Sequence, residues 1–501
     1  MTTPSSRVII VGAGVFGLST ALHLAEAGYT NVTVFDYQPY DQTIYDPEQG
    51  CDSASSDINK IYRCSYGTEV EYQDLAFSGR PIWVRWNEAI AKSRPQDLPN
   101  GITPHTKVFE PNGLLRVSEG KMSQYDIDSM KALEKAGIRH FQHLTSDATD
   151  MARLAKSDGP ATRWRTKLEA FEGVTDGSLT GYLDTSAGLT YADKACVWAR
   201  HLCVKAGVRF ILGPEKGKLQ QLVIEHTPSG RRVTGITTVD GRRHAADVVV
   251  MACGPWTPSL VSETGPILQA TAGSVCQIKL PKSRPDLWDK YSPENFPVWA
   301  YGLTGHESPE YGGFYGFPRS KNGVIKIGYR GRKWINLQPG SNGSSDISTP
   351  ITKYTPVKAT NLPKKAIDNL KKAVDRLFPD LKDVGITGTR MCWYTDSLDN
   401  SFVIDYVPEY SDSLFIATGG SGHGFKFLPV LGKHVRNALE KQEDQFTKLW
   451  RWRLPNKARV DDRQQLDLSS LQMATEEDWQ WTKTAKAIVD RVDMGRERAR
   501  L

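Results

Sequence analysis

The stretch from Arg7 to Asp36, RVIIVGAGVFGLSTALHLAEAGYTNVTVFD, decides the fold. Val8–Val11 reads as a short apolar strand of the kind that is buried on both faces of a parallel sheet. A G-x-G-x-x-G turn, a helical apolar pattern and a second strand ending in an acid follow, as in a dinucleotide-binding βαβ unit. The residues expected to contact the dinucleotide are Gly12, Gly14, Val15, Phe16, Gly17 and Asp36.

Each part of this unit has a physical role. Gly12 permits the tight turn, Gly14 lets the backbone approach a pyrophosphate, and Gly17 lets the helix pack on the sheet. The free amides of the helix N-terminus then point at the phosphates. Asp36, about twenty residues beyond the glycines, would accept hydrogen bonds from ribose hydroxyls, which favours FAD or NAD over NADP.

A second glycine-rich loop, GGSGHGFKFLPVLG at 419–432, occurs near the C-terminal end of the chain. It follows a strand-like segment and precedes a helical one, so it offers a second set of backbone amides. Two such loops suit the longer dinucleotide FAD, because NAD enzymes seldom complete the cofactor site with their C-terminal part. The expected contacts are Gly420, Gly422, Gly424, Phe425 and Lys426, with Gly254 from the turn in ADVVVMACGPW.

The composition is that of an ordinary globular protein. The 501 residues, 39% hydrophobic and 24% charged, can bury a large core and should divide into two or more domains. The net charge of +6 is small, and its interleaved signs indicate neither nucleic-acid nor membrane-surface binding. No apolar run approaches the roughly 20 residues of a membrane span, and no signal peptide fits before the first strand. Seven scattered cysteines indicate a reducing compartment, with neither a disulfide framework nor a metal site.

The chain ends in Ala499, Arg500 and Leu501, a variant of the peroxisomal address S-K-L. We therefore expect a peroxisomal location, with the cytoplasm as the alternative. A hydrogen peroxide-producing activity would strengthen this expectation.

The remaining pattern predicts further helices and strands. Helices are expected at 72–92, 125–136, 190–206 and 364–377, strands from 208 to 254 and from 266 to 333, and a hairpin at 108–117. A long Gly/Ser/Pro-rich connection covers 337–362, and a loop of this length is usually either disordered or functional.

Six segments carry a resemblance to a known family. They are GAGVFGLSTALHLAEAGYTNVTVFD, SASSDINK, GYLDTSAG, GVIKIGYR, MCWYTDSLDNSFVID and GGSGHGFKFLPVLG, in the family's order across nearly the whole chain. The chain resembles the amine-oxidising flavoproteins that include monomeric sarcosine oxidase, pipecolate and saccharopine oxidases, and fungal fructosyl amino acid oxidases (amadoriases).

The resemblance implies an α/β fold, in which a Rossmann-type FAD-binding domain is interleaved with an α+β substrate domain built on a mixed or antiparallel sheet. The implied FAD-binding domain comprises 1–105, 185–262 and 380–450. The substrate domain comprises 106–184 and 263–379, and 451–501 forms a C-terminal tail that wraps the surface.

The resemblance also assigns residues to the cofactor. Cys392, in C-x-Y-x-x-[ST]-x-D, matches a cysteine joined through sulfur to the 8α position of FAD, so a covalent flavin is implied. Ser53, Ser55 and Lys60 lie in the SASSDINK loop, which is expected to pass close to the cofactor, with Lys60 at the flavin face. Strand alternation puts Lys326 and Arg330 on one face. By resemblance, Lys326 is the fixed positive charge that stabilises superoxide as oxygen takes its first electron.

The expected catalytic residues are Lys326, Lys60, Tyr394 and Arg330, and the expected substrate contacts are Tyr62, Arg63, Trp256, Tyr311, Tyr394 and Lys426. Arg63 and Arg330 would bind a carboxylate through two hydrogen bonds, with surface ion pairing as the alternative. Fructosyl amino acid oxidases carry a sugar-binding glutamate and a loop arginine, where this chain offers Tyr311 and His423. These differences favour an N-methyl amino acid over a sugar-amine, and the aromatic residues near the expected pocket favour an aromatic one.

The sequence therefore predicts a monomeric FAD-dependent amine oxidase that acts with O2 and gives an iminium and hydrogen peroxide. Fungal biosynthetic members of the family use such an iminium to close an isoquinoline ring, so an N-methyl-tyrosine or dopa derivative is the expected substrate. The alternatives are a fructosyl amino acid or peptide oxidase, a saccharopine or pipecolate oxidase, a flavin dehydrogenase with another electron acceptor, and a non-catalytic flavin-binding scaffold.

Overall fold

A six-stranded sheet carries the dinucleotide-binding unit, with β1 (Val8–Val11) inside it. The computed structural model describes residues 2–156, 167, 171, 179–228, 230–303, 313–339, 346–352, 354–356, 361–454 and 465–479. The strand order is β21-β22-β13-β1-β2-β9, and only the β21–β22 pair is antiparallel. The other five strands are β2 (Val32–Asp36), β9 (Arg209–Leu212), β13 (Val248–Met251), β21 (Val403–Tyr406) and β22 (Leu414–Thr418).

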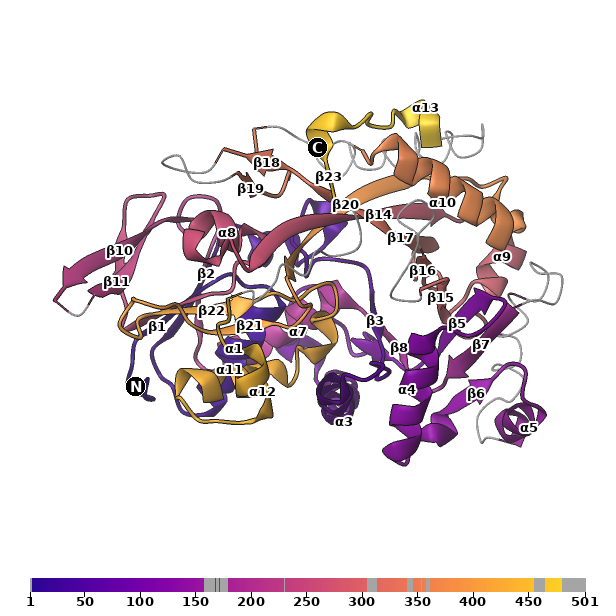
Figure 1. Ribbon diagram of the computed structural model, residues 1–501, viewed down its shortest axis with the longest axis horizontal. Coiled ribbons are helices and arrows are strands. Elements are labelled where there is room, and N and C mark those ends of the chain that lie inside the picture. The colour runs from indigo at the N-terminus through magenta and orange to yellow at the C-terminus, as the bar shows by residue number, and fades with distance from the viewer. Residues whose placement is uncertain are drawn as a thin grey trace.

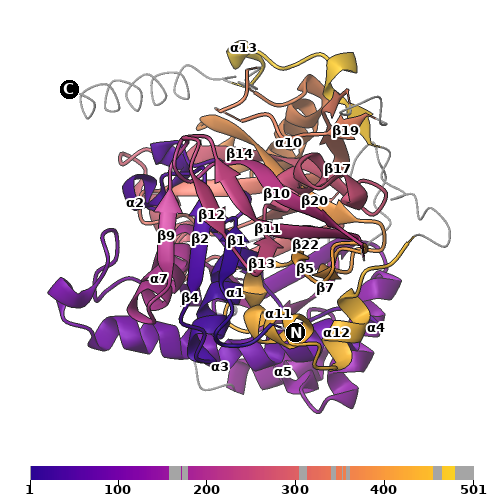
Figure 2. The same ribbon diagram turned by 90° about the vertical axis from the view of Figure 1, so that its left-hand side faces the viewer.

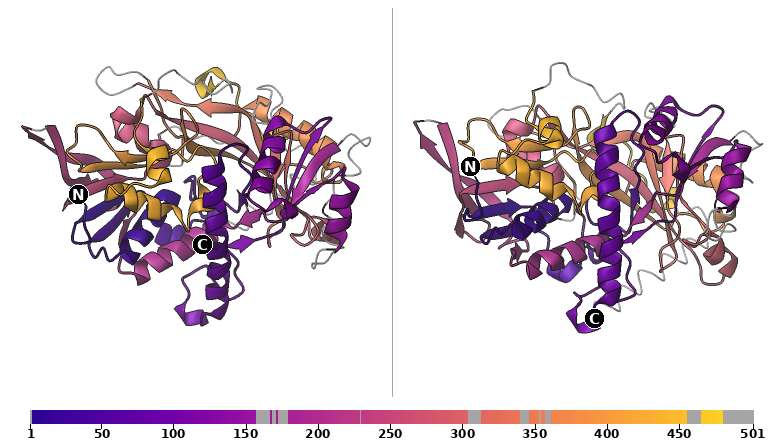
Figure 3. Two further views of the ribbon diagram at one scale, coloured as in Figure 1. Left: turned by 60° about the horizontal axis from the view of Figure 1, so that its bottom comes forward. Right: turned by 90° about the horizontal axis from the view of Figure 1, so that it is seen from below.

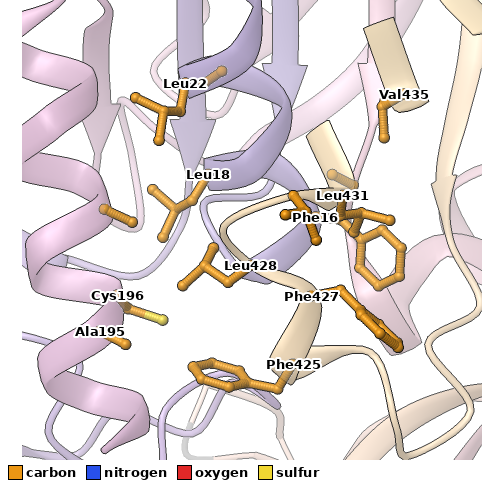
Figure 4. Packing of buried hydrophobic residues seen from close by; sticks show 14 of the residues in the cluster. Phe16, Leu18, Leu22, Ala195, Cys196, Phe425, Phe427, Leu428, Leu431 and Val435 are labelled. Carbon is orange, nitrogen blue, oxygen red and sulfur yellow. The ribbon is translucent and has the colours of Figure 1, made fainter. Parts of the chain in front are cut away.

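Helices cover this sheet, and α1 (Val15–Glu26) contacts both α7 (Ala192–Lys205) and α11 (Leu431–Leu439). Their shared core contains Leu18, Leu22, Ala195, Cys196, Leu428, Leu431 and Val435 (Figure 4). The helix α3 (Val70–Lys92) crosses the underside of the molecule between its two halves (Figure 3). The four expected helices are confirmed by α3, α4 (Gln124–Lys135), α7 and α10 (Lys364–Leu377).

A nine-stranded mixed sheet forms the other half (Figure 1). Its strand order is β20-β14-β17-β16-β15-β5-β7-β6, and β23 (Leu466–Asp467) pairs with β17. The β15–β5 and β17–β23 pairs are parallel, and the other pairs are antiparallel. The strands are β5 (Leu114–Glu119), β6 (Gln142–Leu144), β7 (Leu179–Asp184), β14 (Leu268–Lys279), β15 (Val298–Tyr301), β16 (Phe314–Gly316), β17 (Val324–Ile335) and β20 (Gly388–Ser397). Helix α10 packs on β17, and a separate apolar core lies between them. The expected combination of a Rossmann-type half and a mixed-sheet half is thus confirmed.

Smaller sheets lie at the edges. The sheet of β10 (Leu219–Thr227), β11 (Gly230–Thr238) and β12 (Arg243–Ala245) packs against the six-stranded sheet through Val233 and Ile236 (Figure 2). The others are β3 (Lys60–Tyr62) with β8 (Gly188–Thr190) and β4 (Phe109–Glu110), and β18 (Leu337–Gln338) with β19 (Ile347–Ser348).

The hairpin expected at 108–117 is wrong. β4 pairs with β8, whereas β5 pairs with β7 and β15 in the large sheet. The chain changes sheets at Gly113, whose N–H donates to the Ala187 carbonyl instead of closing a local turn. The chain does turn between β4 and β5, but pairing with distant strands decides the partners of both.

The described part of the C-terminal segment runs along the large sheet. β23 pairs with β17, and the Lys364 N–H donates to the Gln472 carbonyl beside α10. The short helix α13 (Glu476–Trp479) lies next to α10 (Figure 2). Tyr311 and the Ala499–Leu501 terminus lie outside the described residues. Among the described helices, none combines the length and apolarity that a membrane crossing needs.

Candidate active site

A cavity of about 720 Å³ lies between the two sheets and gathers most of the residues selected from the sequence. It is lined by residues from both glycine loops, from the SASSDINK segment and from β14, β17 and β20. The expected residues at its wall are Gly12, Gly14, Val15, Phe16, Asp36, Ser53, Ser55, Lys60, Arg63, Gly254, Trp256, Lys326, Arg330, Cys392, Tyr394, Gly420, Gly422, Gly424, Phe425 and Lys426.

The first glycine turn closes one end of the cavity. Gly12 has φ +110°, and an added Cβ would collide with the Ala252 backbone, so only glycine fits. A Cβ at Gly14 would lie 2.9 Å from Ser55 Oγ, which accepts a hydrogen bond from the Val15 N–H at 2.9 Å. Gly17 does not line the cavity; a Cβ there would collide with the Gly12 carbonyl, as expected for its packing role.

Asp36 is held at the carboxyl end of β2. It accepts hydrogen bonds from the Ala13 N–H at 2.7 Å and the Gln38 N–H at 2.9 Å. Burial raises the pKa of this carboxyl to about 6, although both hydrogen bonds oppose the increase. Each oxygen keeps a lone pair for a further donor, as a ribose contact requires.

The second glycine loop lies against the first one. Cβ atoms at Gly420 and Gly424 would come within 3.1 and 3.4 Å of the Phe16 ring. Ser19 on α1 donates to the Leu428 carbonyl at 2.7 Å and accepts from the Gly432 N–H at 2.7 Å. Phe16 and Leu18 of α1 face Leu428 and Leu431 in Figure 4. These contacts bring distant parts of the chain to one cavity.

Lys326 is a buried cation in the cavity wall. Its side chain is 2% exposed, and Nζ donates to the Asn59 carbonyl at 2.6 Å and lies 2.9 Å from Asp57 Oδ2. Burial lowers the pKa of Lys326 to about 8, and the negative charge of Asp57 limits the decrease.

Asp57 is a site residue that the sequence reasoning missed. Oδ2 also accepts a hydrogen bond from Lys60 Nζ at 2.7 Å, and Arg390 Nη1 lies 3.9 Å from Oδ1. Burial alone would raise the pKa of Asp57, but Lys326, Lys60 and Arg390 outweigh burial and hold it well below its usual range. The available signal was its place beside Lys60, because a buried acid needs a nearby cation.

Cys392 and Tyr394 project from β20 into the same region. Cys392 lies opposite Gly273 of β14, and a Cβ on Gly273 would come 3.3 Å from the Tyr394 ring. Tyr315, which was also missed, lies over Gly328 of β17 in the same way. The two glycines therefore give two tyrosine rings room to lie along the strands at the cavity wall.

Arg63 and Lys426 lie together at one end of the cavity, and both contact Tyr66. The Arg63 guanidinium lies 4.2 Å from the Tyr66 ring centroid, and Lys426 Nζ donates to the Tyr66 hydroxyl at 2.7 Å. Among the described residues, neither cation has a carboxylate partner. Burial, followed by the Arg63 charge, lowers the pKa of Lys426 well below its usual range.

Arg330 and His423 lie at the same end. The Arg330 guanidinium fills the space beside Gly422, where a Cβ would come within 2.9 Å of Nη1. In the described part of the chain, this guanidinium has no hydrogen-bond or ion-pair partner. His423 Nε2 donates a hydrogen bond to the Asn400 carbonyl at 3.0 Å, and Nδ1 lies 3.2 Å from the Tyr66 hydroxyl. Burial lowers the pKa of His423, and Lys426, Arg63 and Arg330 add to the decrease.

Of the expected substrate contacts, Tyr62 is corrected by its placement, whereas Trp256 is at the cavity wall. Tyr62 does not line the cavity; its hydroxyl donates to the Ala76 carbonyl, and its ring packs on Phe109, because β3 turns this side chain into the core. Trp256 does line the cavity. Its ring centroid lies 6.3 Å from that of Tyr37, the residue after Asp36. Trp256 thus lies beside the carboxyl end of β2. Tyr311 lies outside the described residues.

The residues present fit FAD. The cavity volume falls within the roughly 300–1,000 Å³ of small-molecule sites. Two buried polar atoms at the wall, Asn59 Oδ1 and Trp393 Nε1, have no partner within the described chain, as expected where a ligand supplies one. Within the described ranges, no group of three or more His, Cys, Asp or Glu side chains is arranged to hold a metal ion.

Comparison with known proteins agrees with this geometry. Residues 7–438 match the family described as DAO, FAD dependent oxidoreductase. L-saccharopine oxidase of Schizosaccharomyces pombe is 28% identical, with 91% of this chain and 94% of that protein covered. Amino acid oxidase imqH of Aspergillus flavus is 26% identical, with 87% and 92% covered. A solved fructosyl peptide oxidase from E. terrenum has 26% identity and a TM-score of 0.73, with 95% and 99% covered. The chain is therefore an enzyme that belongs to the DAO family of FAD-dependent oxidoreductases.

Proposed function

We propose that this enzyme oxidises the secondary or tertiary amine of an N-substituted α-amino acid to an iminium, with O2 reduced to hydrogen peroxide. The observation that carries the proposal is the pair of cations Arg63 and Lys426. Both line the cavity, both contact Tyr66, and neither has a carboxylate partner in the described chain. A substrate carboxylate supplies the missing negative charge, and an arginine can bind it through two hydrogen bonds.

The chain's own residues then orient the amine and stabilise charge. An amino acid held at Arg63 and Lys426 extends along the tyrosine rings of Tyr315 and Tyr394, which restrict its position and exclude water. When bound, FAD supplies the acceptor for the hydrogen and two electrons that leave the carbon beside nitrogen. Lys326, fixed by Asp57, presents a positive charge that favours the negative charge developing on oxygen.

A more specific proposal is an N-methylated tyrosine or dopa derivative. Tyr66, Tyr315, Phe317 and Tyr394 all line the cavity, and aromatic rings pack favourably on one another. Carbon–carbon bond formation at the iminium carbon, with loss of a ring proton, would close an isoquinoline, a step of fungal secondary metabolism. The enzyme would need only to hold the phenol ring near that carbon.

A second candidate is an amino acid whose N-substituent carries another carboxylate, as in a saccharopine-type substrate. Arg330 favours it, because its guanidinium lines the cavity beside Gly422 with no partner among the described residues. The S. pombe relative is named for L-saccharopine.

Anaerobic bleaching of the bound flavin tests the function and separates the candidates. The panel contains N-methyl-tyrosine, N-methyl-dopa, L-saccharopine, pipecolate and fructosyl-valine. We expect rapid bleaching only with α-amino acids that carry an N-substituent, and none with the matching amines that lack the carboxylate. Equal bleaching by the decarboxylated amines would contradict the role of Arg63 and Lys426, and faster bleaching by fructosyl-valine than by the other compounds would favour a deglycating oxidase.

Replacement of Lys326 by Met separates an oxidase from a dehydrogenase. For an oxidase, reoxidation by O2 should slow by about 10²–10³-fold while reduction by substrate changes little, because a preorganised charge is lost. Stopped-flow absorbance measures both steps. Unchanged reoxidation would indicate another electron acceptor.

A covalent flavin at Cys392 is part of the proposal. The thiol is free, partly exposed and at the cavity wall. Denatured wild-type protein should keep yellow fluorescence on a gel, and Cys392→Ser should release it. Release from the wild-type protein would show that FAD is held without a covalent bond.

We also propose a monomer in the peroxisome, where hydrogen peroxide is safely removed. The address is the terminal Ala499, Arg500 and Leu501. A fluorescent fusion should enter peroxisomes only when these residues are present, and gel filtration gives the oligomeric state.

A further inference from the structure

The cavity continues beyond Asp36 to three aromatic side chains that the proposed reaction does not use. The Tyr37 ring centroid lies 6.3 Å from that of Trp256 and 5.1 Å from that of Tyr354, at interplanar angles of 83° and 88°. All three residues line the cavity and are only partly buried. Part of each ring surface is therefore available to a ligand.

The third aromatic residue comes from the other half of the molecule. Tyr37 and Trp256 follow β2 and β13, whereas Tyr354 belongs to the connection from β17 to α10. Ser348 Oγ in this connection donates to the Ala270 carbonyl at 2.7 Å, and Asn336 Nδ2 donates to the Thr349 carbonyl at 3.0 Å. These bonds fix the connection to its own sheet.

The connection reaches across to the nucleotide end. β19 contacts α8 (Thr257–Leu260), the short helix directly after Trp256, and both lie side by side in Figure 1. Pro350, Thr352, Thr355 and Pro356 line the cavity with Tyr354. Thr355 Oγ1 donates to the Thr352 carbonyl at 2.7 Å, which closes the turn that carries Tyr354.

Two carboxyl groups at this end can accept hydrogen bonds from a base. Asp36 and Asp52 both line the cavity, and Asp52 accepts a hydrogen bond from Gln38 Nε2. Burial raises the pKa of the Tyr354 phenol to about 12, and Asp52 adds to the increase, so the two groups are close. Both carboxyl groups can accept hydrogen bonds from the amino group of a purine. Aromatic rings offer such a base a stacking surface.

We propose that Tyr37, Trp256 and Tyr354 bind the adenine of FAD, and that the connection carrying Tyr354 closes the nucleotide end. The Gly/Ser/Pro-rich connection thereby acquires a role, and Trp256 becomes a cofactor residue instead of a substrate contact. FAD would then be held by both sheets at its adenine as well as along its length. The proposal concerns the cofactor alone, so the outcome of the amine panel does not bear on it.

Nucleotide titration of full-length protein tests the proposal. A Cys392→Ser background makes flavin binding reversible, and calorimetry on the flavin-free protein measures Kd for FAD, ADP and FMN. We expect Tyr354→Ala to raise Kd for FAD and ADP about tenfold, because one stacking contact is lost, and to leave FMN unchanged. The matched control Tyr354→Phe keeps the ring and should stay within about twofold of the unsubstituted background.

Two results would overturn the proposal. One is an unchanged Kd for both FAD and ADP in Tyr354→Ala. The other is an equal weakening of FAD and FMN, which would show that the residue shapes the whole cavity. If Tyr354→Ala does not fold, hydrogen exchange in the Cys392→Ser protein decides: ADP should protect the amides of 346–352 and 354–356, and the absence of protection rejects the contact.

Discussion

Two buried lysines face the cavity, and their surroundings give them different roles. Lys326 has Asp57 at 2.9 Å, whereas Lys426 Nζ, within the described residues, donates to the neutral Tyr66 hydroxyl and to the His423 carbonyl. Burial lowers the pKa of both, but only Lys326 has a carboxylate that limits the decrease. Lys326 therefore keeps its proton more readily in the free enzyme, and Lys426 gains one when an anion binds.

Asp57→Asn should shift the pH midpoint of flavin reoxidation by O2 to a lower value. The pKa of Lys326 is about 8 while Asp57 raises it, so loss of the carboxylate leaves the lysine neutral at a lower pH. Stopped-flow reoxidation across the pH range measures the midpoint. Lys60→Gln is a matched control of opposite sign, because the Lys60 charge lowers the pKa of Lys326 and its removal should move the midpoint upward. If neither variant changes the pH midpoint of reoxidation, Lys326 does not take part in the oxygen reaction.

KM for the amino acid should rise with pH. In the free site the pKa of Lys426 is depressed, and a bound carboxylate raises it, so binding takes up a proton above the free-site pKa. Steady-state KM from pH 6 to pH 10 or so follows this uptake. Lys426→Met should raise KM by about tenfold and abolish the pH dependence. Lys426→Arg should keep a low KM at high pH because arginine stays charged; a pH-dependent KM in the Met variant would point to another group.

At the scale of elements, glycines set how closely the cavity walls approach. Gly273 on β14 and Gly328 on β17 leave room for tyrosine rings from the neighbouring strands. Gly432 lets α11 pack closely against α1. The spacing of apolar residues predicted α1 and α10 correctly; α10 buries one face, whereas α1 is buried on nearly all sides. It did not predict the partners of β4 and β5, since strand pairing depends on segments far along the chain.

Gly432→Ala should destabilise the enzyme by about 1–3 kcal/mol, the usual cost of overpacking. The added Cβ would collide with the Ser19 carbonyl and separate α11 from α1. Thermal unfolding and the FAD content after purification measure the effect. Gly79→Ala in α3 is the control, because its Cβ would meet Val430 only at an ordinary 3.6 Å. If both variants unfold alike, the α1–α11 contact does not hold the second glycine loop.

At the scale of the whole molecule, the cavity lies between two sheets with separate apolar cores. A ligand that touches both should couple their unfolding. The proposed domains, with boundaries after residues 105, 184, 262, 379 and 450, would likewise each have an apolar core of their own.

Removal of FAD should therefore change the unfolding of the enzyme. We expect one calorimetric transition for the holoenzyme and a lower, broader or split transition for the flavin-free Cys392→Ser protein. The same variant reloaded with FAD is the control. A single transition at the same temperature in all three samples would show that the cofactor does not connect the two sheets.

The sequence by itself determined the dinucleotide-binding unit, the second glycine loop and the family, because these depend on local turns, short-range periodicity and contiguous motifs. Most of the site residues that it selected line the cavity. Only the tertiary structure decided that Asp57 holds Lys326, that Tyr62 belongs to the core, and that Trp256 and Tyr354 both lie against Tyr37. Those contacts join different elements of the fold, and the direction in which a side chain points depends on how those elements pack.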